Sequence, residues 1–466
     1  MCKPLPALFL LTAATLLLIG HTSGQNKPDL LTCSPAPCVL PPIQASEGGA
    51  IVNDAPIVVN PLNHKQILVG SNDFNCPYYS SNLGFHLSQD GGSTWNLKCL
   101  DLIYVDFDPY VPIGPDPSVG YDTNGVAYIA GVYFDTKGDN TGFVGFEKSA
   151  DGVNWSPPAV ALYELIKDGI SSATDDWLTI DTSLQSLHRD NVYVSAVVAG
   201  RNLSQWYNDV VVSHSTDSGA HWKAVRVVPP QPSPAEDSYT SMSAGKDGTV
   251  YLTWMYCNYG DGGCIDDKGY MLFSKSSDGG NTWTTPVVMT VVTLNHENLP
   301  NANVGVDNYP AIAVDNSDGP HAGNLYVSMY SWTGTQLRVG VVRSTDGGKT
   351  WSKPVPVAPP SETHDQFFPW ISVSSTGLVG VSWLDRRNDP ANIDYQAFAG
   401  ISRDGGRSFG QNVQLTTAFS NPNLSGENGI GDRTGNTWAG SNFLAAWMDS
   451  SNGVDMQVMV GGIRVH

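Results

Sequence analysis

Positive charge is scarce in this sequence. It has 24 Lys and Arg against 44 Asp and Glu, a formal net charge of −20 over 466 residues. Such a chain lacks the basic surface that binds phosphate backbones and anionic lipid headgroups. We therefore expect neither nucleic acid nor an anionic membrane as a partner. Metal ions, cationic groups and neutral glycans remain compatible with the charge.

Long hydrophobic runs are also nearly absent. The main one, Leu8 to Ile19, is shorter than the ~20 residues that a membrane-spanning helix needs. Lys3 precedes it, and the small residues Thr22-Ser-Gly24 follow it. This pattern predicts a signal peptide over residues 1–24. We expect the mature chain to be soluble and exported, either secreted or periplasmic, with no membrane span.

Cysteine is sparse, and its pattern predicts disulfides. Of the seven cysteines, Cys2 leaves with the signal peptide, and the six that remain can form three bonds. The simplest assumption is that each pairs with its neighbour in the sequence: Cys33–Cys38, Cys76–Cys99 and Cys257–Cys264. None has the CxxC or Cys/His spacing of a zinc site, so we expect no zinc.

Several common signatures are missing, including HExxH, GxSxG, the P-loop and the dinucleotide-binding fingerprint. Long amphipathic helical patterns are nearly absent too. The chain instead has 48 Gly, 31 Pro and many short alternating runs, such as Val250 to Trp254 and Leu325 to Met329. Runs of this kind are typical of β-strands. The sequence therefore predicts an all-β fold.

One short turn motif recurs about every sixty residues. Its first copy reads Ser88-Gln-Asp90-Gly-Gly-Ser-Thr-Trp95, and five more copies centre on Asp151, Asp217, Asp278, Asp346 and Asp404. The Asp side chain can accept backbone N–H bonds within the turn, and the glycines supply positive φ. A motif at this period indicates a repeat protein.

A second landmark raises the count of repeats to seven. An aspartate precedes a short apolar strand in each unit: Asp54, Asp116, Asp176, Asp237, Asp307, Asp365 and Asp432. Four strands per unit predict a β-propeller, with seven blades preferred and six as the alternative.

The predicted domain boundaries follow from these repeats. The last unit is short of an outer strand, and we expect the segment around Pro42 to Ala50 to supply it and close the ring. Residues 25–44 are then an N-terminal extension and residues 45–466 the propeller, which we expect to be monomeric.

The turn motifs resemble the Asp boxes, or bacterial neuraminidase repeats, of the sialidase superfamily, and the resemblance covers almost the whole mature chain. It implies a propeller that acts on glycans as a glycoside hydrolase, with the Asp boxes on the face away from the catalytic centre. Sialidase activity further implies three arginines that clamp the sugar carboxylate, the first in an Arg-x-Pro context. This chain has Asn53-Asp54-Ala55-Pro56 there.

The starts of the first strands are expected to surround the mouth of the central channel. The candidate catalytic carboxylates at these positions are Asp54, Asp116, Asp176, Asp237, Asp307 and Asp365. Crowded carboxylates perturb one another's pKa values, which is how acid–base pairs arise. The same oxygens suit Ca²⁺ as a cofactor. The alternative is that each aspartate caps a turn between blades.

The loops between second and third strands supply further candidates. Trp383-Leu-Asp385-Arg386-Arg387 contains a seventh candidate catalytic carboxylate, Asp385, followed by two arginines that suit an acidic sugar. An Arg–Asp pair within the loop is the alternative. Trp332, Tyr256 and Tyr259 are candidate sugar-stacking residues, the last two in or beside the predicted Cys257–Cys264 loop.

Three hypotheses follow. The chain is a glycoside hydrolase with carboxylates at the channel mouth, a non-catalytic propeller that binds glycan, protein or metal, or a structural protein of a surface assembly. The propeller fold supports all three, so the site must decide among them.

Overall fold

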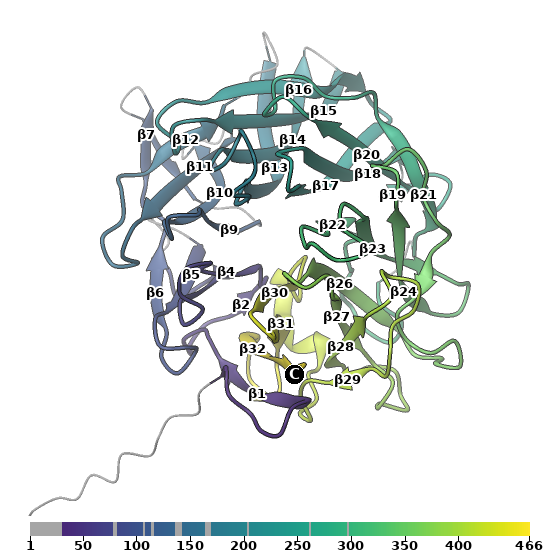
Figure 1. Cartoon of the computed structure of the whole chain (residues 1–466). Coiled ribbons are helices and arrows are strands. Elements are labelled where there is room, and N and C mark those ends of the chain that lie inside the picture. Colours follow the sequence, from purple (N-terminus) through teal and green to yellow (C-terminus); the bar gives the residue numbers. More distant parts are fainter. Residues whose placement is uncertain are drawn as a thin grey trace, which may run out of the picture.

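The described residues of the chain are 30–77, 82–105, 108–112, 116–135, 142–163, 169–202, 205–260, 262–295 and 298–466 of a computed structural model. Their strands form seven antiparallel sheets, which stand as blades around a central axis (Figure 1). The all-β class and the seven-bladed propeller are therefore confirmed. The predicted signal peptide lies outside the described residues.

Each blade has a four-stranded core, in which the first strand lies nearest the axis. Blade 1 contains β2 (Val52–Asn53), β3 (Ile57–Val59), β4 (Ile67–Asp73), β5 (Leu83–Ser88) and β6 (Asn96–Cys99). Blade 2 contains β9 (Ser118–Tyr121), β10 (Ala127–Asp135), β11 (Gly142–Ser149) and β12 (Ala159–Leu162), extended by β7 (Ile103–Val105) and β8 (Asp108–Val111). Blade 3 contains β13 (Gly169–Ile180), β14 (Val192–Asn202), β15 (Gln205–Ser215) and β16 (Lys223–Pro232).

The remaining blades follow in chain order. Blade 4 contains β17 (Ala235–Ala244), β18 (Val250–Gly260), β20 (Lys268–Ser276) and β21 (Val287–Thr293), with β19 (Gly263–Cys264) on β18. Blade 5 contains β22 (Ala311–Val314), β23 (Leu325–Trp332), β24 (Leu337–Ser344) and β25 (Val355–Pro356). Blade 6 contains β26 (Gln366–Val373), β27 (Val379–Asp385), β28 (Gln396–Ser402) and β29 (Val413–Gln414). Blade 7 contains β30 (Gly435–Ala439), β31 (Asn442–Asp449) and β32 (Gln457–Arg464).

The N-terminal strand β1 (Cys38–Gln44) closes the ring by pairing antiparallel with β32 (Figure 1). The sequence predicted this closure but placed the strand later, around Pro42 to Ala50. The strand lies earlier because Leu40 is fully buried against blade 7. Gly49, at φ 113°, turns the chain away before the predicted strand ends.

The second strand of each blade is enclosed by its own sheet and by the flanking blades. β27, for example, is buried at every residue. A strand covered on both faces needs a continuous apolar run in place of an alternating one. The burial of these strands fixes the blades against one another and therefore fixes the geometry at the start of each first strand.

The recurrent turns join the third and fourth strands, at the blade ends opposite the starts of the first strands. Asp278 shows the geometry: one carboxylate oxygen accepts from Ser276 Oγ at 2.8 Å and from the Thr282 N–H at 2.9 Å. The other accepts from Thr282 Oγ1 at 2.6 Å. Burial raises the pKa of Asp278, but these hydrogen bonds outweigh it and lower the pKa to about 2.

Replacing Asp278 by Ala is expected to lower Tm by ~1–3 °C, because the turn loses its acceptors while the blade core stays intact. Thermal unfolding followed by circular dichroism measures the change. Asp318→Ala is the matched control, since Asp318 is exposed and its side chain only pairs with Lys246. Equal melting temperatures for the two variants would contradict a stabilising role for the turn.

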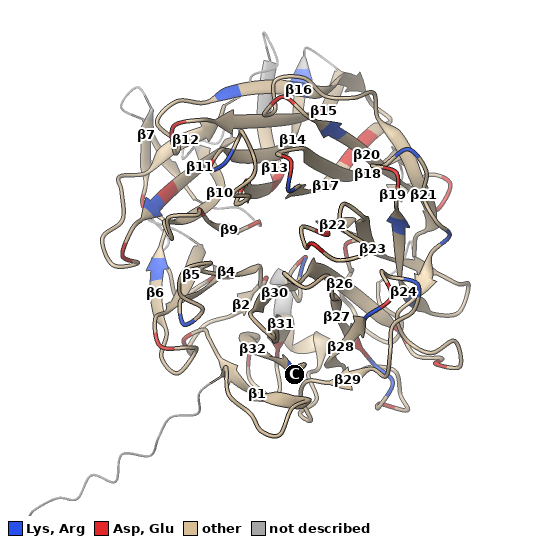
Figure 2. Ribbon diagram, in the orientation of Figure 1, with Lys and Arg blue, Asp and Glu red and all other residues tan. Residues whose placement is uncertain are grey.

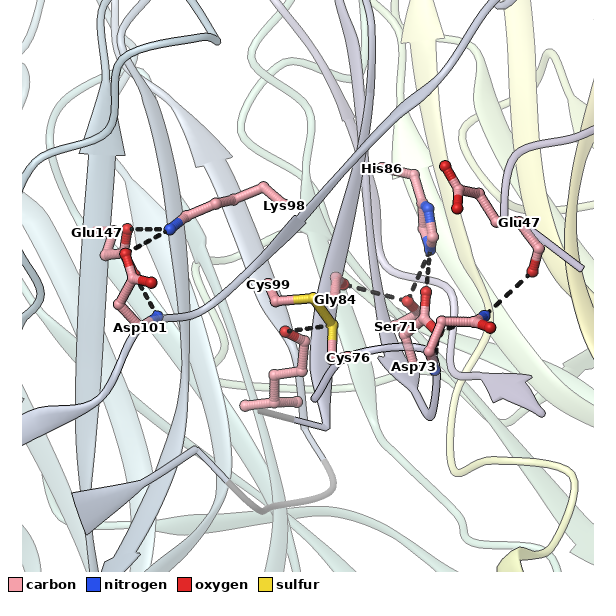
Figure 3. Close-up of a disulfide and its surroundings, with 12 residues drawn as sticks. Glu47, Ser71, Asp73, Cys76, Gly84, His86, Lys98, Cys99, Asp101 and Glu147 are labelled. Carbon is pink, nitrogen blue, oxygen red and sulfur yellow. Dashed lines mark hydrogen bonds and ion pairs between the residues drawn. A yellow bond between two sulfur atoms is a disulfide. The ribbon is translucent and has the colours of Figure 1, made fainter. Parts of the chain in front are cut away.

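All three predicted disulfides are present: Cys33–Cys38, Cys76–Cys99 and Cys257–Cys264. Figure 3 shows Cys76–Cys99 in blade 1 between two polar clusters. On one side, Lys98 pairs with Glu147 at 2.9 Å and thereby ties blade 1 to blade 2. On the other, His86 is fully buried beside Ser71 and Asp73, and burial lowers its pKa to about 4.

Helix is almost absent from the described part of the chain, where the one helical segment is a 3-10 turn at Pro422–Asn428. No helix in these residues has the length and apolar character to cross a membrane.

Candidate functional site

In five blades a residue at positive φ lies within the first strand or just before the run of that strand nearest the axis. These residues are Asp54, Asp116, Asp175, Tyr239 and Phe368, with φ between 46° and 88°. In blades 3, 4 and 6 the strand register shifts at this point, which is the mark of a β-bulge. Bulges redirect side chains, and non-glycine residues at positive φ concentrate at functional sites. The starts of the first strands are therefore the candidate site.

Arg433, at the start of blade 7, occupies the centre of this site and is buried. Its Nη2 donates to Asp116 Oδ1 at 3.0 Å, and its Nη1 donates to the Asp176 carbonyl at 3.1 Å. The guanidinium also lies over the rings of Trp177 and Tyr309, at 5.4 and 5.1 Å from their centroids. One cation thus links four blades.

Six aspartates gather around this arginine, and we call them the carboxylate cluster: Asp54, Asp116, Asp175, Asp176, Asp307 and Asp432. Figure 2 shows acidic segments at the inner ends of β9 and β13, beside the central opening.

Direct contacts connect the members of the cluster. Asp54 accepts from the Asp432 N–H at 2.6 Å, and Asp116 accepts from the Asp175 N–H at 2.9 Å. Blade 7 thereby fixes a carboxylate of blade 1, and blade 3 fixes a carboxylate of blade 2.

The cluster holds more carboxyl groups than one arginine can neutralise, and five of them have raised pKa values. Burial, together with the neighbouring Asp116, raises the pKa of Asp176 to about 8. Burial also raises the pKa of Asp54 to about 6, although Arg433 opposes the shift. The pKa values of Asp175 and Asp432 lie well above their usual range, because burial and then neighbouring carboxylates disfavour their ionised forms.

Asp307 differs from Asp175 and Asp432 in its hydrogen bonds. Burial raises its pKa, and the hydrogen bonds that the Asp432 carboxyl and the Tyr239 hydroxyl donate to it reduce this rise without cancelling it. Hydrogen bonds to a carboxylate favour its ionised form. Asp307 is therefore the member of this trio that ionises most readily, while Asp175 and Asp432 keep their protons.

Tyr239 bridges two of these carboxyls. Its hydroxyl donates to Asp307, and its backbone N–H donates to Asp175. Tyr239 therefore lies between two carboxyls whose pKa values are both raised by burial, that of Asp175 the more strongly. Asp175, Tyr239, Asp307 and Asp432 are all partly exposed, whereas Asp54, Asp116 and Asp176 are fully buried. The partly exposed four are the groups that a ligand can reach.

An aromatic layer packs beneath the cluster. Trp177 and Trp370 lie 4.7 Å apart between ring centroids, and Tyr239 and Tyr309 lie 4.7 Å apart as well. Beyond this layer the innermost strands of all seven blades line a central channel of about 340 Å³. None of the six cluster aspartates lines that channel. The cluster therefore lies outside the lining of this channel.

Replacing Asp176 by Asn is expected to stabilise the protein more at pH 8 than at pH 5. The folded state holds a proton on Asp176 up to about pH 8, whereas the unfolded state releases it near pH 3.9. Stability therefore falls as the pH rises between these values. Asparagine keeps the oxygen that Ser118 Oγ contacts at 2.8 Å but cannot ionise.

Urea unfolding of wild type and Asp176→Asn at both pH values measures the effect. The advantage of the variant is expected to grow by about 1–3 kcal/mol from pH 5 to pH 8. Asp318→Asn serves as the exposed control. An advantage for Asp176→Asn that does not change with pH would contradict the elevated pKa.

Calcium stays a prediction. Within the described ranges, no group of three or more His, Cys, Asp or Glu side chains is placed to hold a metal ion. If Ca²⁺ binds the folded chain, EDTA is expected to lower Tm, because a bound ion stabilises the state that binds it. Equal melting temperatures with and without EDTA would contradict the calcium prediction.

Four of the seven candidate catalytic aspartates meet in the cluster: Asp54, Asp116, Asp176 and Asp307. Asp237 has other partners, since its carboxylate accepts from Trp254 Nε1 at 2.8 Å and from Gln231 Nε2 at 3.2 Å. Asp365 accepts from the Leu337 N–H at 2.8 Å and pairs with Arg386.

The Asp385 loop forms internal pairs. Arg387 Nε donates to Asp385 Oδ1 at 2.9 Å, and the guanidinium stacks 4.3 Å from the Phe398 ring centroid. Trp383 Nε1 donates to the second Asp385 oxygen at 2.7 Å. Arg386 is fully buried and donates to the Pro300 carbonyl at 2.7 Å. These contacts match the alternative that the sequence left open, an Arg–Asp pair that stiffens the loop.

The three predicted stacking residues lie apart from one another. Trp332 is partly buried and packs against the main core. Tyr256 lines a groove between blades 3 and 4, and Tyr259 lies on the Cys257–Cys264 loop with 48% of its surface exposed. None of the three shares a hydrogen bond or ring contact with the cluster among the contacts described.

Sequence reasoning missed Asp175, Tyr239, Tyr309 and Arg433 as site residues. It chose the aspartate nearest each strand, whereas the bulge selects one backbone position irrespective of residue type. A partial signal exists in the sequence, because proline directly follows two of the positive-φ residues, Asp116 and Phe368, and also follows Tyr309. Alignment on that proline would have placed Tyr309 and Phe368 beside Asp116.

No family model and no curated protein matches the sequence. Solved structures do match. A protein of unknown function from Dyadobacter fermentans is 16% identical, covers 78% of this chain and 97% of its own, and gives a TM-score of 0.45. The GH93 α-L-arabinofuranosidase of Fusarium graminearum with arabinobiose is 12% identical, with coverages of 78% and 98% and a TM-score of 0.47.

Sialidases are also among the matching structures. The K499G mutant of the NanB sialidase of Streptococcus pneumoniae is 10% identical, covers 86% of this chain and 83% of its own, and gives a TM-score of 0.44. At these identities and TM-scores, the similarity carries no argument about reaction or substrate. The architecture described above rests on the blades themselves.

Proposed function

We propose that this protein is a glycoside hydrolase in which Asp307 is the general base and Asp175 the general acid. The observation that carries the proposal is the bridge through Tyr239, which bonds to both carboxyls. Hydrolysis needs one carboxyl that accepts a proton and another that donates one. The environments of Asp307 and Asp175 separate their protonation states in that sense.

We propose an inverting reaction for this pair. Inverting hydrolases keep their carboxyls ~6.5–9.5 Å apart, so that a water molecule fits between base and sugar. Asp307 and Asp175 bond to the hydroxyl and the backbone N–H of one tyrosine residue, an arrangement that fits the wider spacing of an inverting pair. Asp432 contacts Asp307 directly and is too close to be the partner acid. Its role is to donate to Asp307 and keep it ionised.

A glycan is the proposed substrate because the recurrent turns resemble those of glycan-acting propellers. The arginines that sequence reasoning offered for an acidic sugar are engaged elsewhere, Arg386 with Asp365 and Arg387 with Asp385. Arg433 is buried and bound to Asp116. No arginine of the described candidate site is therefore free to clamp a sugar carboxylate, and we propose a neutral glycan.

We also propose that the protein works outside the cytoplasm. Its three disulfides are of a kind that persists in oxidising compartments. The N-terminal pattern of residues 1–24 supports export as well.

A second candidate function is glycan binding without turnover. The full burial of Asp54, Asp116 and Asp176 favours it, because an interior set of acids bonded between blades can serve the ring alone. In this case the partly exposed acids at the mouth would bind sugar hydroxyls without transferring a proton.

A panel of aryl glycosides of neutral sugars and of sialic acid, together with a glycan array, separates the two functions. We expect release of aryl alcohol from at least one neutral glycoside. We also expect the first sugar product to have the inverted anomeric configuration by proton NMR. Array binding without turnover would support the second function. Retention of the anomeric configuration would contradict the assignment of Asp307 as base and Asp175 as acid of an inverting enzyme. Release of sialic acid would contradict the proposal that the substrate is a neutral glycan.

A further inference from the structure

A second cavity lies away from the carboxylate cluster, on the seam between blades 3 and 4. It has a volume of about 460 Å³, and no cluster residue lines it. Its walls are mainly apolar and come from β16, β20, β21 and the segment just before β21: Val227, Val228, Pro229, Leu272, Pro286 and Val288. A cavity of this size and character is typical of a small-molecule site.

Two tyrosines supply an aromatic corner of this cavity. The rings of Tyr256 and Tyr270 lie 6.2 Å apart between centroids, at an interplanar angle of 59°. Their hydroxyls bond outside the corner, to Asn258 Oδ1 at 3.1 Å and to Asp266 Oδ2 at 3.3 Å. These bonds hold the rings in place. Rings set at an angle in this way present two π-faces to one guest, as in the cages that bind quaternary ammonium groups.

A carboxylate completes the lining. Asp237 is 1% exposed and belongs to the cavity wall. Its oxygens accept from Trp254 Nε1 and Gln231 Nε2, two neutral donors. No salt bridge to Asp237 is present among the described residues. The two neutral hydrogen bonds are therefore what the structure shows to offset the burial of this carboxyl.

The surrounding charges also favour a cation. Glu236 and Asp209 act on Asp237 from β17 and β15, and Asp266 lies beside Tyr270. Arg226 is a basic group on β16, and its Nε is paired with Asp209 at 2.7 Å. The whole chain adds a net charge of −20. A cation that enters the cavity therefore meets acids on three of the elements around it.

We propose that this cavity binds a small, soluble quaternary ammonium compound of about the size of choline. The methyl groups pack against the two tyrosine rings and the Val and Pro walls, and the positive charge faces Asp237. A quaternary ammonium group has no N–H to donate, so it suits a carboxylate whose hydrogen-bonding capacity is already engaged by Trp254 and Gln231. The site is separate from the proposed hydrolase centre.

Binding is expected to strengthen as the pH rises. Burial, opposed by the Trp254 hydrogen bond and reinforced by Glu236 and Asp209, raises the pKa of Asp237 to about 7. Below this pH the carboxyl is neutral and offers no charge to the ligand. The affinity is therefore expected to be about tenfold higher at pH 8 than at pH 6, in proportion to the ionised fraction.

Isothermal titration of the full chain with choline, at pH 6 and pH 8, tests the proposal. The matched probe is 3,3-dimethylbutan-1-ol, which has the shape of choline with a carbon in place of the charged nitrogen. We expect choline to bind at least tenfold more tightly than the alcohol at pH 8. Equal affinity for the two, or no binding of choline, would overturn the proposal. Binding to phosphatidylcholine vesicles without binding of free choline would overturn the proposal that the ligand is a soluble compound.

Variants separate the cavity from non-specific attraction to an acidic protein. Asp237→Asn keeps an oxygen for Trp254 and is expected to weaken choline binding at least tenfold at pH 8 and to remove the pH dependence. Tyr270→Ala removes one ring and is expected to weaken binding at least fivefold, whereas Tyr270→Phe keeps the ring and is expected to stay within twofold of wild type. Unchanged affinity in both Asp237→Asn and Tyr270→Ala would overturn the proposal. Thermal unfolding of each variant checks that it folds.

Discussion

Replacing Asp307 by Asn is expected to lower the kcat of the proposed glycosidase reaction by about 10³-fold, with little change in Tm. The side chain keeps its shape but can no longer take a proton from water, and positioned general bases contribute ~10²–10⁴-fold. Hydrolysis of whichever neutral aryl glycoside the panel identifies measures the loss. Asp318→Asn, which replaces an exposed aspartate paired with Lys246, is the control.

The identity of the acid is tested in the same assay. Asp175→Asn is expected to slow glycosides with poor leaving groups far more than those with good ones, because only the former need a proton. Azide is expected not to restore the turnover of Asp175→Asn, because an inverting enzyme forms no covalent glycosyl-enzyme intermediate for azide to attack. Full activity of both Asp307→Asn and Asp175→Asn would exclude these two carboxyls as the general base and the general acid. Normal glycan binding by these two inactive variants would show that they remain folded.

Replacing Arg433 by Met is expected to lower the free energy of unfolding at pH 8 by about 3–5 kcal/mol, because it leaves buried carboxylates without their counter-charge. Arg433 pairs with Asp116 at 3.0 Å, and both side chains are fully buried. The loss is expected to be smaller at pH 5, where more of the cluster is protonated and less charge remains unpaired. Urea unfolding at the two pH values measures it.

A double mutant keeps this test informative if Arg433→Met alone fails to fold. Arg433→Met combined with Asp116→Asn removes both charges, and we expect it to be more stable than Arg433→Met. If the double mutant were no more stable than Arg433→Met, the loss in Arg433→Met would not arise from the unpaired charge of Asp116.

The fold could be predicted from the sequence because its repeated features depend on residues that are close together in the chain. The spacing of the six recurrent turns, whose hydrogen bonds at Asp278 lie within seven consecutive residues, gives the repeat period, and the aspartate before each first strand gives the seventh blade. The turn depends on residues adjacent in the chain, so its signature survives in the sequence. The disulfides were predictable for the same reason, since each pair consists of neighbouring cysteines.

The site was harder to predict from the sequence because it depends on the hydrogen-bond register of the first strands. One extra residue at the bulge places Tyr239, and not Asp237, beside the cluster, although the two lie only two positions apart. In blade 3 the same effect makes Asp175 partly exposed and leaves Asp176 buried. A one-residue shift changes the side of the strand on which each side chain lies. Sequence spacing alone does not show where that shift occurs.

The sequence by itself determined the all-β class, the seven repeats, the closed ring and the three disulfides. These features arise from contacts between near neighbours in the chain or from a period that repeats along it. The tertiary structure alone decided which carboxyls meet, which of them keep their protons and where Arg433 lies. Asp116 and Arg433 are more than 300 residues apart, and the pKa values of the cluster follow from burial and neighbouring charge, which exist only once the seven blades have closed around the axis.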